Sequence, residues 1–325
     1  MHMATWIFAH GDTDGICAGA IALAANPEAH VFFTHPYGLA EDLAAAKNRD
    51  KVIICDIALS ESRLTQILQR FSAISENGEL TYIDHHPLPD AILKEKLSGR
   101  VVHNLDSSAS ELAYSAFRSR LDPMLSRVAI FGAIGDYKDD TPLIQHLLER
   151  WDKRALYLES GLLIQGIEGQ KREYELKRNI ISNLARNLPP SSDRRLVKLA
   201  LKQSRLEEAA IQELRDHVHV RGKIAYTVDF PLSLGKTAIY AKGLTNSLVG
   251  VAAEERNGII DMSLRTSNPE VDLNRLLRMI ATKLGGSGGG HPAAAGARIP
   301  KENFQKFLNE LNNNLTYIPH GSQNI

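Results

Sequence analysis

Residues 51–57 read KVIICDI, a continuous apolar run that ends in an aspartate followed by one more apolar residue. Four similar runs are TWIFAH (5–10), HVFFTH (30–35), ELTYID (79–84) and RVVHNL (100–105). Strands that are apolar on both faces are typical of parallel sheets covered by helices on both sides. Ala- and Leu-rich stretches with helical spacing separate most of these runs, at residues 15–25, 38–48 and 60–74. The pattern predicts an α/β domain with a parallel sheet over residues 1–150.

The remainder of the chain is expected to form a helical connector and a second, smaller domain. Between Trp151 and about Val218 there are few strand signals, and apolar residues recur every fourth position from Leu176 to Leu188. This spacing marks one face of a helix, so residues 151–218 are predicted to connect two domains. Strand-like runs return at 222–230, 248–255 and 258–267, the last two around the turn sequence RNG. They predict a mixed α/β domain over residues 219–325.

Bulk composition excludes several classes of protein. With 325 residues the chain is long enough for two domains, and 43% hydrophobic and 23% charged residues are typical of a globular protein. No apolar run approaches the roughly 20 residues that span a bilayer, and the first 15 residues do not resemble a signal peptide. Cys17 and Cys55 both lie in apolar surroundings and give no disulfide framework. We therefore expect a cytoplasmic protein that does not bind membranes.

The formal net charge is zero, so a polyanion would have to meet a local basic patch. One candidate is the stretch from Lys171 to Ile224, which contains 13 basic and 7 acidic residues. Such a stretch is commonly the solvated face of long helices. Basic side chains on one face can also follow a phosphate backbone.

Polar residues that suit chemistry follow the apolar runs of the first domain. The first run ends in HGDTDG, with His10, Asp12 and Asp14, and the third ends in Asp56. The fourth run is followed by Asp84, His85 and His86. Asp136 follows a later apolar stretch, VAIFGAIG at 128–135, which is expected to be a further strand. In parallel sheets, functional groups gather at the carboxyl ends of the strands. We expect all of these side chains to converge on one edge of the sheet.

Several carboxylates in one site raise each other's pKa unless a cation neutralises them. Carboxylates with a few imidazoles and no thiolate favour Mn²⁺ or Mg²⁺, and the number of ligands suits two ions. Any one of these aspartates could instead cap a helix or bind within a turn. Asp139 and Asp140 are interpreted in this way, as N-cap residues before Pro142.

A glycine-rich segment, GGSGGGHPAAAG at residues 285–296, follows a periodic helical stretch in the second domain. It could be a flexible linker. Glycines also let backbone N–H groups approach an anion closely, so the segment could form a nest for a phosphate. His291 and Arg265 could then add a hydrogen bond and a charged fork to the same phosphate.

Taken in order, HGDTDG, ICDI, YIDHHPL, GAIGDY and GGGHPAAAG resemble the motifs of the DHH phosphoesterase superfamily, in its subfamily with a C-terminal DHHA1 domain. The compact first motif and the length are similar to those of the short archaeal RecJ-like nucleases. The resemblance implies a DHH catalytic domain over residues 1–150 and a substrate-binding DHHA1 domain over residues 219–325.

The resemblance also implies the role of each site residue. His10 and Asp12 would bind one metal ion, and Asp14, His85 and Asp136 the other, with Asp56 bridging the two. The expected ions are two Mn²⁺, with Mg²⁺ or Co²⁺ as alternatives. His86 would face the scissile phosphate, and Asp84 would orient the motif. The substrate phosphate or terminal nucleotide would be held by five residues of the second domain: Arg265, Gly288, Gly289, Gly290 and His291.

The leading functional hypothesis is an exonuclease that releases mononucleotides from single-stranded DNA or RNA. A second hypothesis is a phosphodiesterase or phosphatase for small substrates, such as short oligoribonucleotides, cyclic dinucleotides or a nucleoside bisphosphate. A third is a nuclease-like subunit of a replication or repair assembly, with a protein partner. All six expected metal ligands are present, which argues against a purely non-catalytic scaffold.

Overall fold

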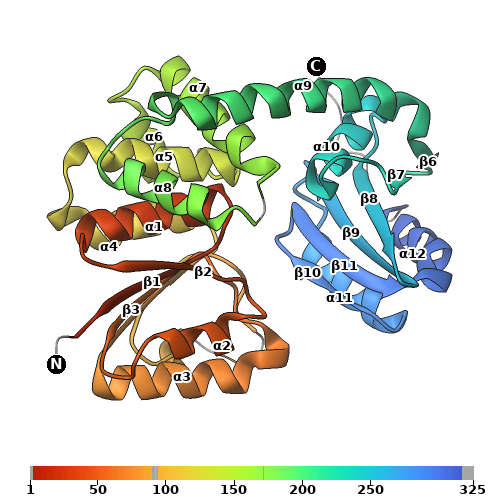
Figure 1. Cartoon of the computed structure of the whole chain (residues 1–325). Coiled ribbons are helices and arrows are strands. Elements are labelled where there is room, and N and C mark those ends of the chain that lie inside the picture. Colours follow the sequence, from red (N-terminus) through yellow and green to blue (C-terminus); the bar gives the residue numbers. More distant parts are fainter. Residues whose placement is uncertain (1–2, 90–91, 93, 171, 317–325) are drawn as a thin grey trace. The chain divides into compact units, whose positions relative to one another are not determined.

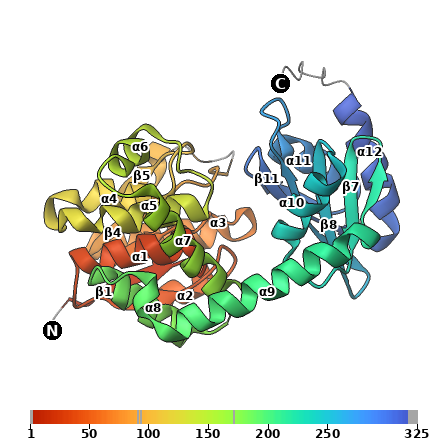
Figure 2. The same ribbon diagram turned by 90° about the horizontal axis from the view of Figure 1, so that it is seen from above.

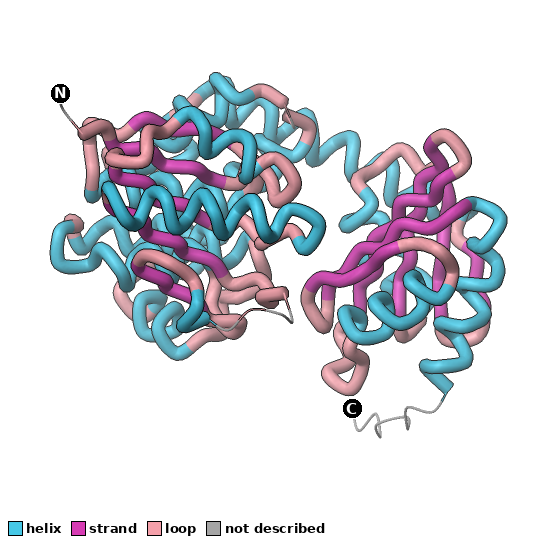
Figure 3. Tube along the Cα trace, turned by 90° about the horizontal axis from the view of Figure 1, so that it is seen from below, coloured by secondary structure: helices cyan, strands magenta, loops and turns pink. Residues whose placement is uncertain are grey.

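A computed structural model describes residues 3–89, 92, 94–170 and 172–316. The chain divides into two compact units, Met1–Ser204 and Arg205–Ile325. Each unit contains its own sheet, drawn in magenta in Figure 3, with helices packed against it. Within the described ranges, no helix is both long and apolar enough to cross a membrane.

The first unit is built on a parallel sheet, as the apolar runs predicted. Among the described residues it has five strands in the order β2-β1-β3-β4-β5, and every neighbouring pair is parallel. Ile53, Ile54 and Cys55 of the central strand β3 have no exposed surface, which explains why that run is apolar at every position. The strands are β1 (Thr5–Ala9), β2 (His30–Phe33), β3 (Lys51–Cys55), β4 (Glu79–Asp84) and β5 (Arg100–His103).

Helices cover both faces of this sheet (Figure 1). One face packs on α1, α4, α5, α7 and α8, and the other packs on α2 and α3, so two separate apolar clusters enclose the strands. The carboxyl ends of the strands therefore open at one edge between two layers. The helices are α1 (Thr13–Ala25), α2 (Leu39–Asp42), α3 (Leu64–Asn77), α4 (Ala109–Phe117), α5 (Ser126–Gly135), α6 (Pro142–Leu148), α7 (Lys153–Glu168) and α8 (Tyr174–Ala185).

The middle of the chain is helical but is not a free-standing connector. Leu176, Ile180 and Leu184 of α8 are at most 2% exposed and belong to the apolar cluster that contains α1, whereas Leu188 is exposed. Only α9 (Arg194–His217) continues from the first unit into the second, and Figure 2 shows it as one long helix. The expected four-residue spacing thus identified a core helix of the first unit.

Two local expectations from the sequence were wrong. Residues 126–135 form helix α5 and not a strand, so Asp136 follows a helix end. Residues 128–135 of this helix are all apolar because the helix is largely buried, and periodicity does not distinguish such a helix from a strand. The N-cap before Pro142 is Thr141, whose hydroxyl accepts a hydrogen bond from the Ile144 N–H, and neither Asp139 nor Asp140 takes this role.

The second unit contains a mixed sheet in the order β10-β11-β9-β8-β7-β6, in which only the β7–β8 pair is parallel. The predicted hairpin around residues 256–258 joins β8 and β9. Helices α11 and α12 pack in the larger apolar cluster, and α10 packs with the end of α9 in another. The elements are β6 (His219–Arg221), β7 (Ile224–Val228), α10 (Leu234–Thr245), β8 (Val249–Arg256), β9 (Ile259–Thr266), α11 (Leu273–Lys283), β10 (Ser287–Gly290), β11 (Ala294–Pro300) and α12 (Phe304–Thr316).

Candidate metal centre

The HGDTDG segment joins β1 to α1, and helix N-termini fix both of its carboxylates. Asp12 is the N-cap of α1, where one oxygen accepts a hydrogen bond from the Gly15 N–H at 3.0 Å. Its other oxygen lies 2.8 Å from Nδ1 of His10. Asp14 is buried and accepts hydrogen bonds from the first two N–H groups of α4, those of Ala109 at 2.6 Å and Ser110 at 2.9 Å. Backbone donors at helix ends stabilise the ionised form of such carboxylates.

Asp56 lies between two groups of possible ligands. Its oxygens are 3.7 Å from Nδ1 of His10 and 3.3 Å from Nε2 of His85. Both oxygens are buried, and neither makes a hydrogen bond with any described residue. Its backbone is left-handed, with φ of 62°, although it is not a glycine. Such strain costs roughly 1–3 kcal/mol and is concentrated at functional sites, so the fold holds this carboxylate in place against a local preference.

Two ligand groups meet at Asp56. The first is His10, Asp12 and Asp56, and the second is Asp14, His85 and Asp136. Within each group the donor atoms lie within 4.8 Å of one another. The contact between Asp56 and His85 joins the groups, so the structure brings together all six residues that were expected to bind metal.

Asp84 and His86 form a third cluster with Asp56 at the end of β4. Asp84 is fully buried and accepts hydrogen bonds from the Tyr82 hydroxyl at 2.8 Å and the His86 backbone N–H at 3.3 Å. Its other oxygen lies 2.9 Å from Nδ1 of His86. Burial lowers the pKa of His86, but the Asp84 carboxylate outweighs it and raises that pKa to about 9. Asp84 is thereby engaged on both oxygens and fixes the ring of His86.

The electrostatics of the centre fit divalent cations. Burial and the nearby Asp12 raise the pKa of Asp56 well above its usual range, and burial with Asp14 raises the pKa of Asp136 to about 8. Burial also raises the pKa of Asp14. A dication neutralises such repulsion, and a set of oxygen and imidazole donors without thiolate suits Mn²⁺ or Mg²⁺. The two oxygens of Asp56 make no hydrogen bond with the described residues, so they could serve as a ligand shared by two ions.

Lys177 is a member of this centre that the sequence did not identify. It lies on α8 and is 4% exposed, in surroundings that also include the charge of Asp12. Burial lowers its pKa, and Asp12 opposes that effect. A Cβ atom on Gly11 would lie 2.9 Å from its Nζ, so the glycine of the first motif leaves room for this side chain. No local pattern on α8 distinguishes Lys177 from its basic neighbours.

Two other polar neighbours of the DHH motif could have been found from the sequence. Tyr82 is two residues before Asp84 on the same strand and therefore shares its face of the sheet. His103 ends β5 in register with Asp84, and its Nε2 lies 2.7 Å from the His86 carbonyl oxygen. The rule that placed the aspartates at strand ends applies equally to this histidine.

The glycine-rich segment of the second unit is not a linker, because it contains strand β10, a turn at residues 291–293 and the start of β11. Gly288 and Gly289 of β10 pair with Ala297 and Gly296 of β11. The Gly290 N–H donates to the Asn274 side chain at 3.1 Å and so already has an acceptor. A Cβ on Gly288 would lie 2.9 Å from Cβ of Leu277, so close packing against α11 explains that glycine.

Arg265 and His291 lie at the same end of the second sheet. Arg265 of β9 is in register with Ala294 of β11. Ala294 in turn closes the turn that His291 begins, because the two residues exchange backbone hydrogen bonds of 2.9 and 3.2 Å. The Arg265 guanidinium donates to the Ser263 hydroxyl at 2.7 Å and to the Leu264 carbonyl at 2.9 Å. Strand pairing therefore brings together two residues that are 26 positions apart in the sequence.

The basic stretch 171–224 does not form a single surface. Lys177 is buried in the first unit, whereas Arg221 belongs to the second unit and donates to Gln305 and Asn309 of α12. Lys171 lies outside the described residues. These residues are accounted for by the simpler interpretation, in which the basic side chains of a helical region make separate local contacts.

Residues 224–316 match the family model described as "DHHA1 domain". Similar solved structures include a DHH domain described as a member of a family of ribosomal proteins, with 17% identity, TM-score 0.72, and 98% of this chain and 88% of the other covered. RecJ from Thermus thermophilus in complex with Mn²⁺ has 19% identity and TM-score 0.66, and the match covers 97% of this chain but 52% of RecJ. The pGpG-specific phosphodiesterase PggH from Vibrio cholerae has 14% identity and TM-score 0.62, with 96% and 99% covered. No curated protein sequence matches the chain.

The fold likeness extends over nearly the whole chain, whereas the family model covers the second unit only. The first unit carries the HGDTDG and DHH motifs at the carboxyl edge of its parallel sheet. Residues 224–316 therefore match a DHHA1 domain, and the chain as a whole has the fold seen in these DHH-domain and RecJ structures.

Proposed function

We propose that the chain is a two-metal phosphodiesterase that removes mononucleotides from the end of single-stranded DNA or RNA. The observation that carries the proposal is Asp56, a buried carboxylate without hydrogen bonds to the described residues that faces a ligand group on each side. Similarity to RecJ in complex with Mn²⁺ supports the choice of a nuclease and of Mn²⁺. We propose two such ions, with Mg²⁺ or Co²⁺ as substitutes.

In this proposal His10, Asp12 and Asp56 hold one ion, and Asp14, His85 and Asp136 hold the other with Asp56 as the shared ligand. When bound, a pair of ions supplies a hydroxide nucleophile and neutralises charge on the phosphate. His86 contributes as a hydrogen-bond donor. The Asp84 carboxylate raises the pKa of this ring and orients it. Nδ1 lies 2.9 Å from an oxygen of Asp84, and in this proposal Nε2 donates to a phosphate oxygen.

The second unit is proposed to hold the substrate. Arg265 offers a guanidinium and His291 an imidazole at one end of its sheet, beside the glycines of β10 (Gly288, Gly289 and Gly290). A guanidinium and an imidazole both donate hydrogen bonds to phosphate oxygens, which every nucleotide carries. The grip is therefore expected to be independent of sequence, as an exonuclease requires.

A second candidate is a phosphodiesterase for short oligonucleotides or cyclic dinucleotides. The similarity to PggH favours it, because that match covers nearly all of both chains. In either case the first unit performs the same hydrolysis. A replication or repair partner for the nuclease is a further proposal, compatible with both candidates.

The experiment that tests the proposal uses end-labelled DNA and RNA strands of graded length, from dinucleotides to long oligonucleotides, incubated with Mn²⁺. An exonuclease gives a ladder that shortens one nucleotide at a time from long strands. Hydrolysis confined to dinucleotides and other very short strands would favour the second candidate. No cleavage of any length in Mn²⁺, Mg²⁺ or Co²⁺ would contradict both.

The same assay separates the roles of the two units. His291→Ala is expected to keep both metal ions, measured by mass spectrometry, and to cut strands at least tenfold more slowly, since it removes a phosphate contact and orientation with it. Arg265→Ala is expected to lose affinity, and the loss will shrink as salt increases, because salt already weakens the ionic contact in the unmodified chain. His219→Ala, an exposed histidine of the same unit, is the control. Loss of metal in His291→Ala would place this residue in the metal centre instead.

Lys177→Met is expected to lower turnover by about 10- to 100-fold, the range for residues that support metal ligands. Methionine keeps much of the length of the buried side chain but removes the positive charge beside Asp12. Lys198→Met, a lysine of the same unit outside the metal centre, is the matched control. The measurements are turnover at saturating substrate and melting temperature, compared between the two variants. Equal turnover in both variants would mean that Lys177 only fills space.

A further inference from the structure

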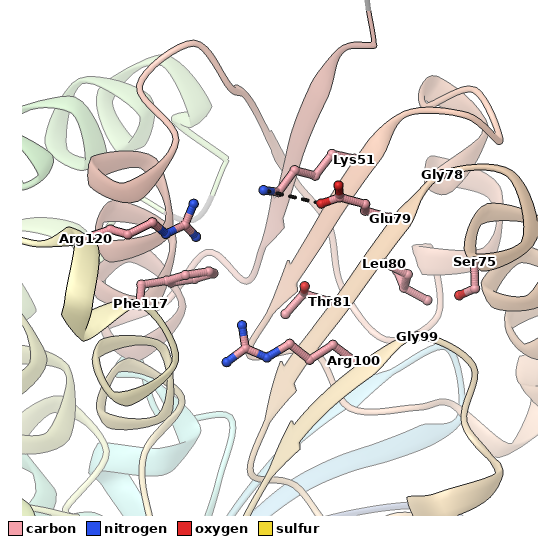
Figure 4. Close-up of a pocket in the computed structure, with 10 residues that line it drawn as sticks. All are labelled: Lys51, Ser75, Gly78, Glu79, Leu80, Thr81, Gly99, Arg100, Phe117 and Arg120. Carbon is pink, nitrogen blue, oxygen red and sulfur yellow. Dashed lines mark ion pairs between the residues drawn. The ribbon is translucent and has the colours of Figure 1, made fainter.

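The first unit has a second polar site at the amino-terminal edge of its sheet (Figure 4). It is a pocket of 290 Å³ formed by the beginnings of β3, β4 and β5 and by the turn after α4. The strands β3 and β4 begin here, with Lys51 and Glu79, and end at Cys55 and Asp84 beside the metal centre. At about 3.3 Å per residue, the strands separate the two sites by roughly 15–20 Å.

Positive charge dominates the walls of this pocket. Lys51, Arg100 and Arg120 supply three cations, and Glu79 is the one acid in the lining of the described pocket. Lys51 lies 3.5 Å from Glu79, so that acid is matched by one of the three cations. Figure 4 shows the charged ends of Lys51 and Arg120 facing each other across the opening, with the guanidinium of Arg100 on its lower side.

The two arginines are not used by ion pairs in the part of the chain described. Arg100 donates to the Ala116 carbonyl at 3.2 Å, which leaves its charge uncompensated. The Arg120 guanidinium lies 5.1 Å from the ring centre of Phe117, an arrangement that orders it without neutralising it. The Ser75 hydroxyl, which also lines the pocket, is buried and has no hydrogen-bond partner among described residues. The walls therefore offer donors and positive charge in excess of the single carboxylate.

We propose that this pocket binds a small phosphorylated molecule of the size of a nucleoside monophosphate. Two guanidinium groups suit the oxygens of a phosphate monoester, which accept bidentate hydrogen bonds. The volume lies near the lower limit of small-molecule sites, about 300 Å³, and so fits one such molecule and not a polymer. Because none of the proposed metal ligands lines the pocket, the binding is independent of the hydrolytic function proposed above.

The test is titration of the full chain with AMP by calorimetry in the presence of a chelator, which prevents phosphate binding at the metal centre. We expect AMP to bind, adenosine not to bind, and inorganic phosphate to compete with AMP. In the Arg100→Gln/Arg120→Gln variant, affinity for AMP should fall tenfold or more, since two charge-assisted contacts are lost. Raising the salt concentration should weaken binding to the unmodified chain more than to this variant.

Arg118→Gln is the matched control, because Arg118 belongs to the same turn as Arg120 but does not line the pocket. It should bind AMP as the unmodified chain does. Melting temperatures verify that the variants are folded, which the exposed positions of Arg100 and Arg120 favour. The proposal is overturned if AMP does not bind, if adenosine binds equally well, or if the double variant keeps the affinity of the control.

Discussion

Replacing Asp56 with asparagine is expected to abolish hydrolysis while the fold survives. The change removes one negative charge from the carboxylate that both ligand groups share, and it alters neither the size nor the shape of the side chain. Asparagine tolerates the left-handed backbone at this position, where φ is 62°. A fall in turnover of roughly 10³-fold is expected, the scale seen when a group that stabilises transition-state charge is lost.

The chain offers a close control for this substitution. Asp229 is also a non-glycine residue in the left-handed region, with φ of 54°, and it lies in the second unit. One of its oxygens accepts a hydrogen bond from the Glu255 N–H, which an asparagine oxygen can still accept. Asp229→Asn should therefore keep full turnover and both metal ions. Near-normal activity of Asp56→Asn in Mn²⁺ would contradict the shared-ligand model.

Removing divalent ions is expected to abolish activity and to lower the melting temperature. Without cations the first unit buries Asp14 and Asp56 beside the partly buried Asp136, and these carboxylates repel one another. An ion that binds only the folded state, present at a concentration of about 100 times its dissociation constant, adds about 2.7 kcal/mol to the free energy of unfolding. Activity and melting temperature should both return when Mn²⁺ is restored. Full activity in excess chelator would exclude a metal-dependent mechanism.

The loss of stability without metal should depend on pH. Asp136 has a pKa of about 8 in the folded protein, against an ordinary value of 3.8, so the folded state holds more protons between these values. His86, with a pKa of about 9 against 6.5, acts in the same direction. Stability of the chelated protein therefore falls as pH rises from about 5 to 9. Asp12 and Asp84, whose pKa values are lowered, are ionised throughout this window and do not change its slope. Melting curves at several pH values, with chelator and with Mn²⁺, measure the difference.

The sequence by itself determined the parallel sheet and most of the candidate metal centre. Burial on both faces makes strands such as β3 apolar at every position, and that pattern is visible without a structure. In such a sheet all carboxyl ends lie at one edge, so His10, Asp56 and His85 could be expected to meet although they are far apart in the chain. The position of each residue in the sequence was enough to predict this, because each one directly follows the strand that carries it to the edge.

Only the tertiary structure decided the parts that depend on packing between distant segments. Asp136 reaches the centre from the end of a buried helix, and an apolar helix gives the same local pattern as a strand. Lys177 lies near Gly11 because α8 packs against α1 within the first unit, and nothing near Lys177 in the sequence signals this contact. The pocket of Lys51, Arg100 and Arg120 arises where strand beginnings meet the turn after α4. Such sites depend on how separate elements pack together, and side-chain packing over long range leaves no periodic mark in the sequence.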